Sequence, residues 1–541
     1  MKIIDVIGLF AKIDSSPYLT CASGGLLAAM WIWYRKLRHD AMTKRDKTRQ
    51  QKQAQSPSIA KRWRQKIPQG LVLGRANKRE YFCLPEKAAD SGFSVGHALV
   101  MGGSGTGKTS SVYAMSILSD FINKKDNPDL FYNFLAVDIK GEIHKTFCPP
   151  VHPPAEGKEN PYFLIDPTDR ELSYGYNPFC LIDDADYVSH DLIIQVSSDI
   201  ASAFVPVSDK DRYFSQNALS ILTGCVAYCI EHSPRIELAD MMRCLISEDV
   251  KSVMQEIWED ARPDSVAMHF LGRFQGKSKD NESLDDIIST LTTQLNAFAL
   301  DATTYMLRDN PYRISAADIR KKPIILSVPD NLLDENTFAP VYRMILTSMQ
   351  RYLISRIPPP GTTPVVLFYD ELFSLGGSEK GSGIPDLQHF LSISRQYGAA
   401  VVAAVQSEKM LVKQYGREGA KILEDNMCKV ILQITDADTI RAAKDWTGQF
   451  KERNISVNSG SQMTSSISFS KQDIFDGADF SSLVAQQKVV VVPLDDHFMT
   501  IRKAQWFREP EFIQMQKEIT APDDETYTPS AHRKSQSRNQ S

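Results

Sequence analysis

A glycine-rich segment, "GGSGTGKTSS", has the residue types and the spacing needed to hold a phosphate group. It fits the P-loop pattern G-x-x-x-x-G-K-[ST] from Gly102 to Thr109, in which backbone amides face an anion at the positive end of a helix dipole. Lys108 is expected to reach the β- and γ-phosphates of a nucleotide, and Thr109 to bind Mg²⁺ through its hydroxyl. The loop residues expected to contact the nucleotide, taken to be ATP, are Gly102, Gly103, Ser104, Gly105, Thr106, Gly107, Lys108, Thr109 and Ser110. The alternative is a glycine-rich turn that binds nothing, but a strand-like run before the loop and a helical run after it favour the P-loop.

A pair of acidic residues after the apolar run "VVLFY" supplies what a P-loop lacks. A P-loop by itself indicates binding, whereas hydrolysis needs a carboxylate beside the metal ion. We expect Asp370 to hold hydrated Mg²⁺ together with Thr109, and Glu371 to orient or deprotonate the attacking water. Taken alone, the short pattern also fits a strand that ends in a solvated turn. Its presence in the same chain as a P-loop favours the catalytic interpretation.

Both motifs must be positioned by a sheet, and the sequence predicts one. Continuous apolar, β-branched runs alternate with helical segments, which is typical of parallel strands buried on both faces. The predicted fold class is therefore α/β of the P-loop type, with a mostly parallel sheet. Tyr174–Phe179, "YGYNPF", is predicted to be a turn. The expected strands lie within Phe131–Glu142, Tyr162–Pro167, Lys322–Pro329, Thr363–Glu371, Gly398–Ser407, Cys428–Thr435 and Lys488–Leu494.

The nucleotide-binding domain is expected in two parts, residues 70–182 and 310–512. Between them, residues 183–309 carry apolar side chains at helical spacing and few β-rich runs, which predicts an all-helical insertion domain. Asn454–Ser470 is rich in serine and is predicted to be a flexible loop. Residues 513–541 form a polar tail that we expect to be disordered.

The composition is that of an ordinary globular protein of two or three domains, with 541 residues of which 42% are hydrophobic and 24% charged. The net charge of -4 argues against a uniformly basic nucleic-acid coat, so contacts with a polyanion require a local patch or a channel. The eight cysteines include no C-x-x-C pair. Cys225 and Cys229 have helical spacing in an apolar run, which favours reduced core thiols over a metal site.

The N-terminal region differs from this ordinary composition. Tyr18–Tyr34 is uncharged, with a length near the lower limit for a helix that crosses a bilayer. The next segment, Arg35–Lys66, carries twelve Lys or Arg against two Asp. By the positive-inside rule we expect a single-pass membrane anchor, with the bulk of the chain in the cytoplasm. We assign residues 1–34 to the N-terminal segment and anchor and 35–69 to a basic linker; a surface or core helix is the alternative to the transmembrane helix.

The set of short motifs resembles the type IV secretion coupling proteins, the TraG/TraD group of conjugative ATPases. These motifs are "GGSGTGKTSS", "VDIKGE", "GYNPF", "FYDELFSLGG", "SISRQYGAAVVAAVQS" and "NMCKVIL", and the resemblance covers residues 70–507. It implies a RecA-like fold, ATP and Mg²⁺ as cofactors, and catalytic roles for Lys108 and Glu371. It also implies that Arg395 is an arginine finger, which acts on the nucleotide of a neighbouring subunit, and that Gln406 is a polar sensor.

The resemblance also implies partners and an assembly. An arginine finger that acts between subunits requires a ring or a filament, so a homohexamer is expected. The implied function is that of an inner-membrane ATPase that couples DNA–protein substrates, a relaxosome with its relaxase, or effector proteins, to the subunits of a type IV secretion channel. Contacts with DNA are expected to be independent of base sequence. Two alternatives stay open: a docking receptor for effector proteins that does not pump DNA, and an FtsK-like DNA translocase outside any secretion system.

Two further groups of residues are candidates for contact with the nucleotide or with DNA. Asp138, Lys140 and Glu142, after the first apolar run beyond the P-loop, are expected to line the nucleotide cleft. Arg273, with Lys277 and Lys279, is a basic candidate for contact with DNA. A solvated loop is the favoured interpretation of that basic segment.

Overall fold

The computed structural model describes residues 63–66, 68, 70–84, 87–88, 92–93, 96–126, 132–139, 141–207, 211–232, 236–275, 282–328, 338–376, 382–459, 463–494 and 497–521. The predicted span Tyr18–Tyr34, most of the basic linker and the tail beyond residue 521 lie outside these residues, as do Lys140, Lys277 and Lys279. Of the helices in the described ranges, none has both the length and the apolar character that crossing a membrane requires.

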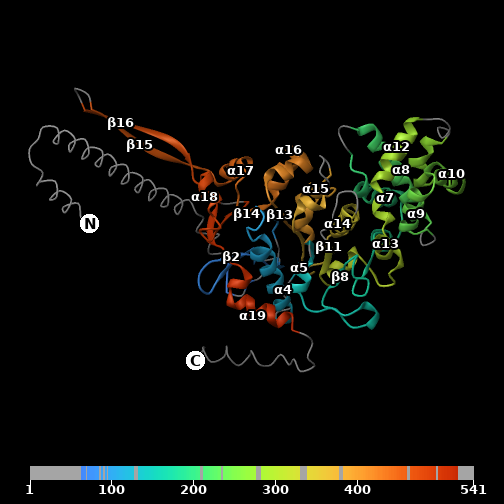
Figure 1. Cartoon of the computed structure of the whole chain (residues 1–541), viewed down its shortest axis with the longest axis horizontal. Helices are drawn as coiled ribbons and strands as arrows, with labels where there is room; N and C mark the ends of the chain where they lie inside the picture. The colour runs from blue at the N-terminus through green and yellow to red at the C-terminus, as the bar shows by residue number, and fades with distance from the viewer. Residues whose placement is uncertain are drawn as a thin grey trace, which may run out of the picture. The chain divides into compact units, whose positions relative to one another are not determined.

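A twelve-stranded sheet lies at the centre of the described α/β part, in the order β1-β3-β2-β18-β17-β14-β6-β13-β12-β7-β11-β8 (Figure 1). Neighbouring strands from β14 to β8 are parallel, and those from β14 through β17 to β1 are antiparallel. The sheet is therefore mostly parallel, which confirms the predicted α/β class. In sheet order, the strand bounds are Arg64–Gln65, Tyr81–Leu84, Leu71–Arg75, Met499–Arg502, Lys488–Val492, Cys428–Gln433, Ala98–Gly102, Ala399–Val405, Val365–Tyr369, Asn133–Ile139, Ile324–Val328 and Phe163–Ile165.

The parallel strands are continuous apolar runs because their side chains are buried on both faces of the sheet. Every residue of β13, "AAVVAAV", is buried, and so is every residue of β6. Helices α4 (Ala114–Asp126) and α19 (Pro510–Ile519) pack against each other, and Phe512 of α19 belongs to the same hydrophobic core as β6. Since β6, β12 and β13 run in the same direction, the residues that follow them meet at one edge of the sheet.

A group of helices lies between β9 and β10 along the chain, as the apolar spacing in residues 183–309 predicts. Helix α8 is at its centre: most of its second half is buried, Cys225 and Cys229 included, and α7, α11 and α12 pack on it. Gly224 allows the close approach of α11, because a Cβ there would lie 2.5 Å from Leu271. The limits of the predicted domains stay a prediction. The helices are α7 (His190–Phe204), α8 (Arg212–Glu231), α9 (Leu238–Ser247), α10 (Val250–Asp260), α11 (Val266–Leu271), α12 (Glu282–Gln294) and α13 (Asp301–Thr304).

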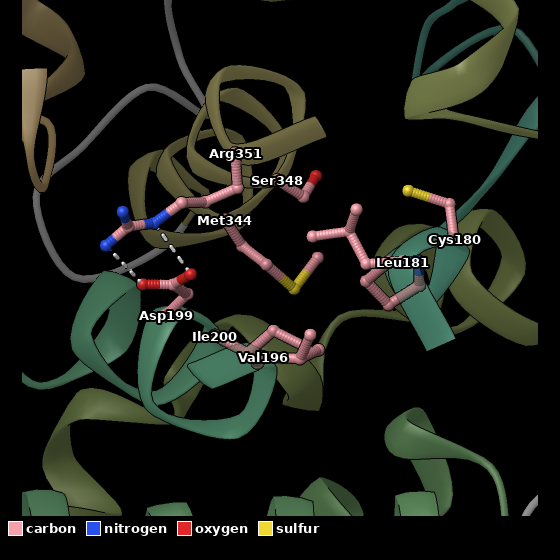
Figure 2. A pocket seen from close by; sticks show the side chains of 9 residues that line it. Cys180, Leu181, Val196, Asp199, Ile200, Met344, Ser348 and Arg351 are labelled. Carbon is pink, nitrogen blue, oxygen red and sulfur yellow. Dashed lines mark hydrogen bonds and ion pairs between the residues drawn. The ribbon is translucent and has the colours of Figure 1, made fainter. Parts of the chain in front are cut away.

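An ion pair joins the first of these helices to α14 (Ala339–Ser355), which follows β11 along the chain (Figure 2). The Arg351 guanidinium lies 2.8 Å from one oxygen of Asp199 in α7 and 3.0 Å from the other. Met344 and Ile200 lie beside this pair, and Ser348 lines the same pocket. Burial raises the pKa of Asp199 to about 6 against the opposing effect of Arg351, so the pair is largely withdrawn from water.

The structure corrects three sequence predictions. The tail that was expected to be disordered from residue 513 begins with the last seven residues of α19, which are helical. The predicted flexible loop Asn454–Ser470 instead belongs to a long antiparallel hairpin of β15 (Gln449–Ser459) and β16 (Met463–Asp473), which forms a unit of its own within the described chain. Serine-rich composition suggested a loop, but β-branched residues recur in both strands and favour pairing. The predicted turn Tyr174–Phe179 contains a short strand, β9 (Gly175–Asn177), which pairs in parallel with β10 (Arg313–Ser315).

Candidate nucleotide-binding site

The predicted P-loop connects β6 to the helical segment that begins at Thr109. Gly105 and Gly107 have positive φ angles, 73° and 86°, which glycine adopts without the steric cost that a Cβ imposes. At Gly102 a Cβ would lie 2.5 Å from the Thr106 hydroxyl, so the turn needs glycine there too. The pattern in the sequence is therefore the pattern that this backbone requires.

Lys108 lies inside the loop and bonds to it. Its ammonium donates to the carbonyl of Gly102 at 2.9 Å and to that of Gly103 at 3.3 Å, and the side chain is buried. Burial lowers the pKa of Lys108, while the nearby carboxylates of Asp370 and Glu371 oppose that shift. The two acidic residues thus help to keep the ammonium charged at the base of the loop.

Thr109 and Asp370, the two predicted metal ligands, are in direct contact. The Thr109 hydroxyl donates to Oδ2 of Asp370 at 2.8 Å, although the residues are far apart along the chain. The other oxygen, Oδ1, is buried and has no hydrogen-bond partner in the described residues. Burial raises the pKa of Asp370 to about 6. A buried carboxylate oxygen without a partner beside a hydroxyl is a donor set that suits a hard cation such as Mg²⁺.

Glu371 and Gln406 also meet, as their positions after adjacent parallel strands require. Gln406 Nε2 donates to Oε1 of Glu371 at 3.4 Å, and the Ser374 hydroxyl donates to Oε2 at 3.4 Å. Glu371 has a positive φ of 59°, which is unfavourable for a residue with a Cβ and is found most often at functional sites. The Glu371 carboxylate lines the cleft and is held there by Gln406 and Ser374.

A cleft of about 420 Å³ is lined by part of the loop and by both acidic residues, whereas Gln406 bonds to Glu371 without lining the cleft. Gly102, Gly103 and Thr106 do not line it either. Of the predicted residues, it is lined by Ser104, Gly105, Gly107, Lys108, Thr109, Ser110, Asp138, Glu142, Asp370 and Glu371. Asp138 also has a structural task, because its oxygens accept the backbone N–H groups of Ile143 and His144, each at 2.9 Å, and contact Nδ1 of His144 at 2.8 Å. It therefore holds the start of α5 (Glu142–Phe147) against the cleft.

Arg395 is the predicted catalytic residue that the fold does not bring to this cleft. It is exposed in a short helical turn, Ser394–Tyr397, which precedes β13, whereas Gln406 follows the same strand. A seven-residue strand spans roughly 23 Å. The side chain bonds instead to the Asn426 carbonyl at 3.5 Å. Contact between Arg395 and a nucleotide therefore requires the cleft of another subunit.

Three residues near the C-terminus belong to the site and were not found from the sequence. The Lys503 ammonium donates to the Thr106 carbonyl, Gln505 Nε2 donates to the Ser110 hydroxyl at 3.3 Å, and Phe507 lines the cleft. They follow β18 along the chain, and almost 400 residues separate Lys503 and Gln505 from their partners in the loop. No motif in "IRKAQWF" marks them, so only the position of β18 in the sheet could have identified them.

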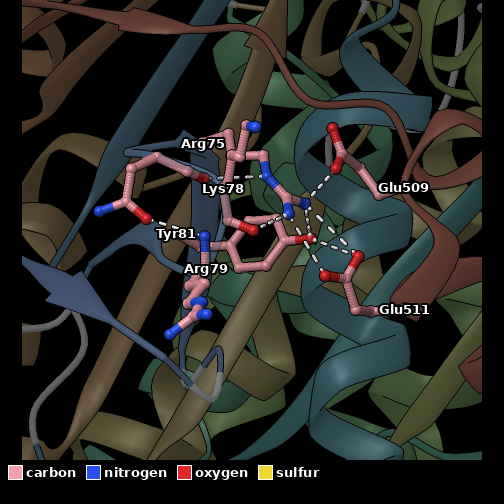
Figure 3. A network of polar contacts seen from close by, with 7 residues as sticks. Arg75, Lys78, Arg79, Tyr81, Glu509 and Glu511 are labelled. Atoms are coloured by element: carbon pink, nitrogen blue, oxygen red, sulfur yellow. Dashed lines mark hydrogen bonds and ion pairs between the residues drawn. The ribbon is translucent and has the colours of Figure 1, made fainter.

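A polar network fixes the far end of this C-terminal segment (Figure 3). Arg75 of β2 forms an ion pair with Glu509 and a second one, at 3.3 Å, with Glu511 of α19. The Tyr81 hydroxyl of β3 donates to Glu511 at 3.2 Å, and the Arg75 guanidinium lies 4.7 Å from the centre of the Tyr81 ring. Residues after β18 are therefore held at the loop and again at Glu509.

Comparisons with known proteins give the family and the fold of the chain. Residues 37–528 match the family described as "Type IV secretory system Conjugative DNA transfer". No curated protein sequence matches the chain. The plasmid coupling protein TrwB in complex with the non-hydrolysable ATP analogue ADPNP is 15% identical, with a TM-score of 0.57 over 83% of this chain and 92% of that one. The unbound bacterial conjugative coupling protein TrwBdeltaN70 is also 15% identical, with a TM-score of 0.55 over 75% of this chain and 84% of that one. At this identity the likeness shows a shared fold.

Proposed function

We propose that this chain, which belongs to the type IV secretory system conjugative DNA transfer family, is an ATPase. It hydrolyses ATP to drive DNA–protein or effector substrates into a type IV secretion channel. The observation that carries the proposal is the Asp370 carboxylate, which bonds to Thr109 through one oxygen and leaves the other buried and unpartnered in the cleft. Family membership favours this reading over an FtsK-like translocase outside a secretion system.

Each residue of the cleft has a separate task in this proposal. Thr109 and Asp370 hold Mg²⁺, which when bound supplies positive charge against the phosphates. Lys108 exchanges its two carbonyl partners for phosphate oxygens, and the loop amides bind the rest of the phosphate chain. Glu371 orients the attacking water and accepts its proton, while Gln406 holds the Glu371 carboxylate in place.

A homohexamer completes the site in this proposal. Arg395 is exposed at the amino end of β13, so it is available to a neighbouring subunit and not to its own cleft. A guanidinium supplied from outside a nucleotide site neutralises charge that develops on the transferred phosphoryl group, with an effect of about 10³- to 10⁵-fold in related chemistry.

The proposed location is the bacterial inner membrane, with the nucleotide-binding domain in the cytoplasm. The uncharged segment Tyr18–Tyr34 and the basic residues after it motivate this topology. Fractionation of cells that express the full chain tests it. The protein is expected to stay with the membrane pellet after washing with alkaline carbonate, and its release by that wash would contradict a transmembrane anchor.

The decisive experiment measures ATP turnover by the full chain with and without single-stranded DNA at two salt concentrations. Lys108→Ala is expected to lower turnover by at least about 10²-fold, the effect of removing one preorganised charge-stabilising group. Lys421→Ala is the matched control, because Lys421 is exposed on α16 (Glu408–Asn426) and pairs only with Asp425 in the described residues. Normal turnover in Lys108→Ala would refute the site.

The same experiment separates the proposal from its alternative. Stimulation by DNA that weakens at higher salt is expected of a motor that grips the phosphate backbone. Turnover that is indifferent to DNA, together with effector binding that survives Lys108→Ala, would instead favour a docking receptor for effector proteins.

A further inference from the structure

The segment that leaves β18 contacts the phosphate loop through Lys503 and Gln505. Lys503 is 4% exposed, and its ammonium supports the loop from behind through the Thr106 carbonyl. The Gly107 Cα is approached so closely that a Cβ there would lie 3.0 Å from Lys503 Nζ and 3.1 Å from Gln505 Nε2. Lys503 and Gln505 thus fix where the next residues of the segment stand relative to the loop.

Phe507 is the residue that this arrangement presents to the cleft. It is 45% exposed, and among the described residues it provides the one aromatic side chain that lines the cleft. Its neighbour Trp506 packs edge-on against Phe147 of α5, with ring centres 5.3 Å apart, and so turns toward the protein. The Arg508 guanidinium lies 5.8 Å from the centre of the Phe507 ring and is bonded to Gln487 at 3.0 Å.

The position of Phe507 is held from both directions. Before it, Lys503 and Gln505 bond to the loop; after it, Glu509 pairs with Arg75 (Figure 3). An exposed aromatic ring held on the rim of a cleft is a low-entropy surface for another flat ring. The cleft wall on the side of α5 adds two apolar residues, Ile139 and Ile143.

We propose that Phe507 is the stacking surface for the nucleobase of the bound nucleotide, and that Lys503 and Gln505 are positioning residues that set its distance from the phosphate loop. This inference rests on the proposed nucleotide site and adds its nucleoside end. The phenyl ring has no hydrogen-bonding group, so it contributes to the binding of any purine and does not distinguish ATP from GTP.

The test compares the affinities of ATP and of inorganic tripolyphosphate, each with Mg²⁺, by calorimetry on the full chain. Phe507→Ala is expected to weaken ATP binding by about 5- to 150-fold, the range for loss of one base–aromatic contact, and to weaken GTP binding equally. Tripolyphosphate, which has no base, is expected to bind with unchanged affinity. Phe507→Trp is expected to keep its affinity for ATP. Phe507→Leu is expected to lose most of the ATP affinity that Phe507→Ala loses.

Tyr312→Ala is the matched control, because Tyr312 is 43% exposed and lies outside the lining of the cleft. Equal loss of ATP and tripolyphosphate in Phe507→Ala would overturn the inference, since the ring would then act through the phosphate loop. Loss of neither would overturn it as well. Failure of the unaltered protein to bind either compound would refute the proposed function itself, a result distinct from both.

Discussion

Replacing Asp370 by asparagine is expected to stabilise the nucleotide-free protein while it weakens Mg²⁺-dependent nucleotide binding. Burial raises the pKa of Asp370 from 3.8 to about 6, a difference of about 2 pH units. At about 1.4 kcal/mol per unit, the ionised carboxylate costs the folded state about 3 kcal/mol above pH 7. Asparagine has no charge to bury and still accepts from Thr109, but it leaves a buried polar group unpartnered. An unpartnered buried polar group costs about 1–3 kcal/mol, so the expected net gain is about 0–2 kcal/mol.

The pH dependence gives this prediction its direction. Because the pKa of Asp370 is higher in the folded state than in the unfolded state, the folded state binds the proton first as the pH falls. The stability of the unaltered protein should then rise relative to Asp370→Asn between about pH 6 and pH 4, and the advantage of the variant should disappear below pH 4. Urea unfolding of both proteins at pH 7.5, 5 and 4, without nucleotide, measures this.

A neighbouring carboxylate supplies the control. Asp138 is also buried, but both of its oxygens accept hydrogen bonds, so Asp138→Asn replaces an acceptor by a donor and is expected to destabilise by about 1–3 kcal/mol. With ATP and Mg²⁺ at 100 times the dissociation constant, the unaltered protein should gain about 2.7 kcal/mol and Asp370→Asn much less. A less stable Asp370→Asn at pH 7.5, or an advantage that does not change with pH, would refute the reasoning.

Gly107→Ala is expected to lower the free energy of unfolding by about 1–2 kcal/mol and to lower nucleotide affinity, because its φ of 86° is unfavourable with a Cβ, which would also crowd Lys503. Gly157→Ala is the control, because its φ is 66° but the space around it is open. Calorimetry should find that it lowers stability without lowering nucleotide affinity. Arg395→Ala is expected to keep nucleotide binding and to lose turnover by about 10³-fold or more. Mixing it with Glu371→Gln subunits should restore part of the turnover in a coupled ATPase assay, and no recovery in verified mixed oligomers would count against a site shared between subunits.

The part of the site that the sequence predicts is the part whose geometry is local or follows from parallel strands. The P-loop is contiguous, so its glycines report directly on backbone angles such as that of Gly107. Asp370 and Gln406 follow apolar runs, and in a parallel sheet the carboxyl ends of such runs share one edge. The contact of Asp370 with Thr109 and that of Glu371 with Gln406 could therefore be anticipated without coordinates.

Most of the antiparallel half of the sheet was not predicted, for a physical reason, and of its strands only β17 falls within an expected one, Lys488–Leu494. Strands β1, β2 and β3 are short and β2 contains a glycine, so their runs are weak signals of strands. The hairpin β15–β16 has the same difficulty, because its serines suggest a loop and its stability depends on pairing across the turn. Strand pairing of this kind is decided by neighbours that no single window of sequence contains.

The C-terminal residues of the site follow from the strand order once that order is known. Strand β14 is parallel to β6, β17 is antiparallel to β14, and β18 is antiparallel to β17, so β18 runs in the same direction as β6. The chain after β18 therefore emerges at the edge of the sheet that carries the P-loop, and Lys503 is its first residue. Lys503 belongs to no sequence motif, and it reaches the site because the strand direction reverses twice, from β14 to β17 and from β17 to β18. In this fold the C-terminal strand brings the segment ending at Phe507 to the nucleotide cleft, and a truncation before Lys503 would remove one wall of it.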